Sequence, residues 1–155
     1  MIQLLTNIEV KKNAGLIYKF LLTLDREKYC QWHPAHKDFE VIKRTEQELG
    51  SILYFKEIVD GTAVKYKWRI IELTENKLVK MRALYFYPVY LTIALESLSE
   101  NKTIVHHHLD IGYRVKFLSL IPDWVVGHTL FSPKKRKSQQ QHAIEEYTNL
   151  EHLLD

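Results

Sequence analysis

Apolar and polar side chains alternate over residues 2–12, which predicts a half-buried strand. Asn13 is suited to cap a helix, because apolar residues follow it at helical spacing as far as Leu24. A second short helical segment is expected over 25–31, and Pro34 ends it. The chain therefore starts with one strand and two short helices.

From about residue 38 to residue 113 the hydrophobic period is two. Turn signals divide this part into six strands joined as hairpins, at Leu49-Gly50, Asp60-Gly61, Glu75-Asn76, Tyr87-Pro88 and Glu100-Asn101. Lys65, Lys67 and Arg69 alternate with apolar residues in one of these strands. This pattern predicts an antiparallel sheet with one wet face and one apolar face.

A long helix is expected from about Pro133 to Leu154, because apolar residues form a stripe along it. The apolar, irregular segment 117–126 before it has the character of a lid over a cavity mouth. A sheet with one apolar face must bury that face, and the long helix is the natural partner. We therefore predict an α+β fold with a curved seven-stranded antiparallel sheet around a long C-terminal helix.

This order of elements resembles the helix-grip fold of the START and Bet v 1-like (SRPBCC) superfamily. The resemblance covers the whole chain and rests on element order and pattern. It implies an apolar cavity between the sheet and the last helix, and therefore a small hydrophobic or aromatic molecule as partner. Fold alone does not specify chemistry.

Composition narrows the class of protein. The chain has 155 residues, 46% hydrophobic and 26% charged, which predicts one globular domain over 1–155. Lys and Arg number 22 against 19 acidic residues; this net charge of +3, which the cluster 134–137 could supply, does not indicate a nucleic-acid binder. No apolar run approaches the ~20 residues of a membrane span. The single Cys30 fits a reducing compartment, and we expect a cytoplasmic protein.

His142 and Glu146 lie four residues apart on the expected last helix, a spacing that points both side chains the same way. They flank its apolar stripe, so they would border the cavity, although an exposed pair is the ordinary alternative. Glu57 falls on the apolar side of its strand unless a bulge shifts the alternation. With a histidine from Trp32-His33-Pro34-Ala35-His36, two imidazoles and two carboxylates would suit zinc.

His36 adjoins the start of a strand and is the first candidate for that histidine, which leaves His33 to support the site or contact substrate. In the triplet 106–108, alternation places His107 on the interior face. It is suited to bind a substrate oxygen or carry a proton, or it is a core histidine satisfied by a hydroxyl.

The segments Tyr29-Cys30-Gln31-Trp32-His33-Pro34-Ala35-His36 and His142-Ala143-Ile144-Glu145-Glu146-Tyr147-Thr148-Asn149-Leu150-Glu151 resemble the signature segments of the 2,4-diacetylphloroglucinol hydrolase family. The resemblance implies zinc, held by His36, Glu57, His142 and Glu146. It also implies hydrolysis of the bond between an acyl carbon and an aromatic ring carbon. The chain has no room for the N-terminal region that shapes the substrate pocket of the family's characterised member, so the substrate does not transfer.

In this chemistry a proton must reach the leaving ring carbon, and His107, His33, Tyr29 and Tyr113 are the candidates to supply it or to polarise the carbonyl. Tyr66, Trp68, Met81 and Tyr85 are expected to form the apolar walls of the pocket. Two other functions remain open, a carrier of hydrophobic ligands and a metal-free polyketide cyclase or dehydratase. Bound metal separates the hydrolase from both.

Overall fold

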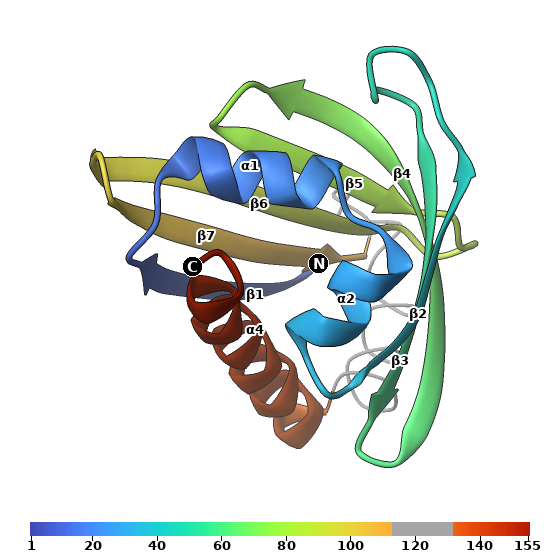
Figure 1. Cartoon of the computed structure of the whole chain (residues 1–155). Coiled ribbons are helices and arrows are strands. Elements are labelled where there is room, and N and C mark those ends of the chain that lie inside the picture. The colour runs from blue at the N-terminus through green and yellow to red at the C-terminus, as the bar shows by residue number, and fades with distance from the viewer. Residues whose placement is uncertain (113–131) are drawn as a thin grey trace.

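The protein is described by a computed structural model over residues 1–112 and 132–155 (Figure 1). In chain order the elements are β1 (Ile2–Val10), α1 (Ala14–Leu22), α2 (Arg26–Trp32), β2 (His36–Lys43), β3 (Ile52–Val59), β4 (Thr62–Thr74), β5 (Leu78–Ala83), β6 (Val89–Ser99), β7 (Lys102–Ile111) and α4 (Pro133–Leu153). The predicted six strands after the short helices are confirmed, as are the two short helices and the long last helix.

The seven strands form one antiparallel sheet in the order β1-β7-β6-β5-β4-β3-β2. The sheet curves, and α2 and α4 lie on its concave side (Figure 1). Contacts of α4 with β1 and of α2 with both β2 and α4 hold the helices there. The α+β helix-grip fold expected from the element order is confirmed.

Local capping explains where the two short helices begin. The side chain of Asn13 accepts a hydrogen bond from the Gly15 backbone N–H at 2.7 Å, and Asp25 accepts one from the Lys28 N–H at 2.8 Å. Each cap satisfies a backbone donor at a helix start. The second cap sets the rotation of α2, whose buried residues are Tyr29 and Trp32.

A tight hairpin fixes the register of β3 against β4. Asp60 and Gly61, which join the two strands, both have positive φ, 50° and 75°. This is the backbone of the two-residue turns that match the twist of a hairpin, and Asp-Gly is well suited to it. The register that follows pairs Glu57 with Val64 and leaves the alternation of β3 undisturbed against β4.

The last helix buries one side of its second half. Ala143, Tyr147 and Leu150 are buried against the sheet, as the apolar stripe predicts, whereas Lys134 and Glu145 are exposed. Within residues 1–112 and 132–155, no helix is long and apolar enough to cross a membrane. His142 and Glu146 flank the buried residues of α4, and their side chains are only 12% exposed.

Candidate metal centre

Four polar side chains from three separate elements meet inside the fold. His36 opens β2 and is the cross-strand neighbour of Glu57 on β3, while His142 and Glu146 face them from α4. The side chain of His36 is fully buried, and those of the other three are between 12% and 14% exposed. Glu57 therefore points inward from β3, and His142 and Glu146 point inward from α4, as the sequence predicts.

One ligand atom from each of these four residues lies within 4.8 Å of the others, so the group could hold a metal ion. Nε2 of His36 is 2.7 Å from Oε1 of Glu146 and 3.9 Å from Oε1 of Glu57. Nε2 of His142 is 3.4 Å from Oε1 of Glu146 and 3.8 Å from Oε2 of Glu57. A tetrahedral site with bonds of ~2.0–2.1 Å separates its ligand atoms by about 3.3–3.4 Å, so small side-chain adjustments suffice.

Tyr29 fixes the orientation of the His36 ring through a hydrogen bond and a stacking contact. Nδ1 of His36 lies 2.9 Å from the backbone carbonyl oxygen of Tyr29, which can only accept, so Nδ1 carries the proton and donates it. The two rings are stacked with centroids 3.9 Å apart and an interplanar angle of 5°. Nε2 is thereby directed at the carboxylates, an arrangement typical of metal-binding histidines.

Tyr29 also holds the second carboxylate. Its hydroxyl donates a hydrogen bond of 2.7 Å to Oε1 of Glu57. Burial, and then the charge of Glu57, raise the pKa of Tyr29 well above its ordinary value, so the hydroxyl stays protonated and acts as a donor. One residue of α2 thus positions one imidazole and one carboxylate of the cluster.

Nε2 of His142 is the one buried side-chain N or O atom in the described part of the chain that has no hydrogen-bond partner. Its distances to both carboxylates are given above, but neither contact has hydrogen-bond geometry. A buried polar atom without a partner is costly. A cation among these side chains would satisfy this nitrogen, which is the observation that fits the cluster to a metal.

The pKa values of the two carboxylates are shifted in opposite directions. Burial, and then the charge of Glu146, raise the pKa of Glu57. Burial also works to raise the pKa of Glu146, but contacts from His142 and His36 outweigh it and hold that pKa well below its usual range. Burial works to lower the pKa of His142, and the neighbouring Glu146 outweighs it, so the pKa is raised. Without a cation, this cluster therefore depends on shared protons, which a divalent metal would displace.

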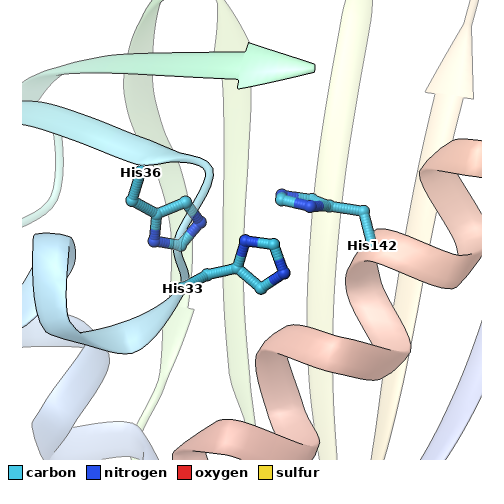
Figure 2. A group of neighbouring side chains, drawn as sticks. All are labelled: His33, His36 and His142. Carbon is cyan, nitrogen blue, oxygen red and sulfur yellow. The ribbon is translucent and has the colours of Figure 1, made fainter. Parts of the chain in front are cut away.

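His33 lies beside the cluster but uses its nitrogens elsewhere. The rings of His33, His36 and His142 lie beside one another in Figure 2, and one nitrogen from each lies within 4.8 Å of the others. However, the Ala35 backbone N–H donates to Nδ1 of His33 at 3.0 Å, which leaves the Nε2 proton to be donated to Glu145 at 3.2 Å. Burial lowers the pKa of His33, in keeping with a neutral ring.

A cavity of about 780 Å³ adjoins the cluster. Glu57, His142, Glu146 and Tyr29 lie in its wall, whereas His36 and His33 stand behind it. The rest of the described wall is mainly apolar, and it includes all of the expected pocket residues, Tyr66, Trp68, Met81 and Tyr85.

The structure also places His107 in this wall, with its ring centroid 6.1 Å from that of Tyr147. Burial lowers the pKa of His107, so the neutral ring is favoured. Its neighbours His106 and His108 lie on the other face of β7, where His106 contacts Asn7 and Glu96. Tyr113 and the expected lid over 117–126 lie outside the described residues.

Sequence reasoning missed two contacts that join α2 to α4. The indole N–H of Trp32 donates to the backbone carbonyl of Glu146 at 2.6 Å, and Glu145 is the partner of His33. Both run between segments more than a hundred residues apart. Trp32 and Glu145 do stand next to candidate site residues in the sequence, and that adjacency was the one signal available for them.

No protein-family model matches the sequence, and no curated protein matches it at a significant level. Solved structures do match. Ginseng major latex-like protein 151 from Panax ginseng is 12% identical, with 99% of this chain and 97% of that chain covered and a TM-score of 0.74. Zhui aromatase/cyclase from Streptomyces sp. R1128 is 13% identical, with 99% and 93% covered and a TM-score of 0.68. A START superfamily protein from Mycobacterium smegmatis is 17% identical, with 90% and 95% covered and a TM-score of 0.61. At these identities the likeness is one of fold, and the chain has the helix-grip fold of the Bet v 1 and START-like structures.

Proposed function

We propose that this protein is a zinc-dependent hydrolase that breaks the bond between the acyl carbon and the ring carbon of an acyl-phenol, or the bond between a carbonyl carbon and the central carbon of a β-diketone. The observation that supports it is the convergence of four donor atoms, from His36, Glu57, His142 and Glu146, at the wall of an apolar cavity. The reaction type comes from the resemblance of segments 29–36 and 142–151 to the 2,4-diacetylphloroglucinol hydrolases.

Zinc is the metal that the donor set suits, because two imidazoles and two carboxylates give mixed nitrogen and oxygen ligands. When bound, zinc would supply a Lewis acid for a carbonyl group and lower the pKa of water toward neutrality. His36 is the better ligand than His33, since its Nε2 faces the carboxylates while both nitrogens of His33 are engaged.

The cavity accounts for the aromatic character of the proposed substrate. Its volume of about 780 Å³ lies within the ~300–1,000 Å³ of typical small-molecule sites. Tyr66, Trp68 and Met81 offer flat and polarisable walls for a ring, with the cluster at one side. Apolar walls also keep bulk water away from the reacting bond.

His107 is the residue best placed to carry the proton. Of the other candidates, Tyr29 donates its hydroxyl to Glu57, and His33 stands behind the wall. In the proposed reaction water adds to the acyl carbon and the bond to the ring breaks, giving a carboxylic acid and an arene. A neutral His107 accepts the proton that water loses and returns it to the ring carbon, so protons balance.

The first test is the zinc content of the untagged protein, measured by elemental analysis before and after treatment with a chelator and reloading. We expect about one zinc per chain, as for a four-ligand site. His142→Ala should abolish binding. His152→Ala is the matched control, because it removes an exposed histidine from the same helix and should leave the metal in place. Acyl-phenols and β-diketones are then screened with the loaded protein.

A carrier of hydrophobic ligands is the second candidate, and the largely apolar cavity wall favours it. The likeness in fold to Zhui aromatase/cyclase keeps a metal-free cyclase as a third. Both predict no specific zinc and no effect of His142→Ala on metal content. A stoichiometric metal without turnover of any acyl-phenol would leave a structural ion as the better account.

A further inference from the structure

The convex face of the sheet carries a group of cations that the candidate metal centre does not use. We call this group the basic face; it consists of Lys56, Lys65, Lys67, Arg69 and Arg82. Each of these residues alternates with cavity-lining neighbours on β3, β4 or β5, so each points to the outside. In the register of the sheet, Lys56 lies opposite Lys65 and Arg69 lies opposite Arg82.

Like charges directly opposite each other destabilise a sheet. Within residues 1–112 and 132–155, no ion pair involves any residue of the basic face, although the adjacent Lys80 is paired with Glu72 at 3.6 Å. The five charges exceed the net charge of the whole chain, which is +3, so the rest of the molecule sums to −2. Arg82 lies over the Tyr90 ring at 6.0 Å, but no ion pair among the described residues balances the five charges of the basic face.

An apolar projection stands beside the basic face. Leu84, Tyr85 and Phe86, which we call the 84–86 tip, follow β5 and are 37%, 47% and 99% exposed. The Leu84 backbone N–H donates to the carbonyl of Lys67 at 2.8 Å, and the Tyr85 hydroxyl donates to that of Lys65. The turn reaches past β4 at the right-hand edge of Figure 1.

The same tip borders the cavity, because Tyr85 and Phe86 belong to its wall. Moving a fully exposed phenylalanine from water into an apolar phase is favourable, because its apolar surface is removed from water. Beside cations, aromatic and aliphatic residues are typical of proteins that lie on a bilayer, where the rings enter the interface and the cations meet anionic headgroups.

We propose that the basic face and the 84–86 tip together dock this protein on an anionic lipid bilayer. Nucleic acid is the less suitable partner for these charges, since its binding sites add stacking platforms along a groove. Here Phe86, which is 99% exposed, stands on the 84–86 tip. This inference does not depend on a metal.

Sedimentation with large vesicles tests the proposal. The intact protein should bind phosphatidylcholine vesicles that contain phosphatidylglycerol, bind pure phosphatidylcholine far more weakly, and dissociate as salt is raised. Each basic residue near an anionic surface contributes about fivefold in affinity, so Lys65→Glu/Lys67→Glu should weaken binding by roughly 25-fold or more. Phe86→Ser should weaken it about tenfold.

The matched control is Lys11→Glu/Lys19→Glu, which changes the net charge equally at two exposed lysines, one directly after β1 and one in α1. It should keep most of the vesicle binding, and all variants should keep the circular dichroism of the folded protein. The proposal is overturned by absence of binding to anionic vesicles. It is also overturned if the control loses as much as the basic-face variant, or if the protein retains an oligonucleotide but no vesicles.

Discussion

Replacing Tyr29 by phenylalanine tests whether its hydroxyl helps to position the candidate metal ligands. The substitution removes one hydroxyl, which donates at 2.7 Å to Oε1 of Glu57, and keeps everything else that Tyr29 does. The ring still stacks on His36, and the backbone carbonyl still accepts from Nδ1 of that histidine. Tyr29 is only 1% exposed, so a water that replaced the lost donor would have to come from the cavity that Tyr29 and Glu57 line.

The size of the effect follows from that single bond. A hydrogen bond to a charged group contributes about 1.5–3 kcal/mol, which corresponds to roughly 10- to 150-fold in a binding constant. Loss of a group that orients a metal ligand typically costs ~10–100-fold in metal affinity. We therefore expect Tyr29→Phe to weaken zinc binding by one to two orders of magnitude without loss of the fold.

The assay is competition for zinc between the protein and a chromophoric chelator, with circular dichroism as the check on folding. Tyr90→Phe is the matched control, since the hydroxyl of Tyr90 makes no hydrogen bond to the described residues and its loss should leave affinity unchanged. A folded Tyr29→Phe protein with zinc affinity within about twofold of the wild type would refute the role of Tyr29 in holding Glu57 as a ligand.

Three further outcomes are expected. His36→Ala should abolish zinc binding, whereas His33→Ala should retain it at reduced affinity; equal losses in elemental analysis would contradict the assignment. Burial lowers the pKa of His107, so the folded state resists protonation and the metal-free protein should lose stability as pH falls below about 6.5. Thermal melts of His107→Gln should show a shallower pH dependence on the acid side, and parallel curves would count against a buried neutral ring. Trp32→Phe removes the donor to the Glu146 carbonyl and should cost about 1–3 kcal/mol in urea unfolding; a loss under about 0.5 kcal/mol would show that this bond is not important.

Much of this fold could be predicted from local pattern, because alternation and turn chemistry act over a few residues. Asp60 and Gly61 supply the backbone angles of a tight hairpin, and that hairpin fixes the register that keeps Glu57 inward. The spacing of His142 and Glu146 likewise needs only a helix. These short-range rules suffice to bring the four candidate ligands to one interior.

The rest depends on how distant elements pack, which local pattern does not encode. The bond from Trp32 to α4 and the pairing of His33 with Glu145 exist only once α2 and α4 are docked. The basic face also depends on how distant residues are brought together. Three of its cations are visible as the wet side of one strand, but Lys56 and Arg82 join them through the sheet register.

The energetic cost of the cluster is itself an argument for function. Four ionisable groups are buried or nearly buried beside an apolar cavity, and one of their nitrogens has no partner. Replacing such groups by well-packed apolar residues is often neutral or stabilising by ~1–4 kcal/mol, so they are poor devices for stability alone. Tyr29 directs both His36 and Glu57 toward the same point, and a network with a purely structural role would not need this convergence. A cation bound at the cavity wall would remove this cost, since it would satisfy His142 and neutralise the carboxylates at once.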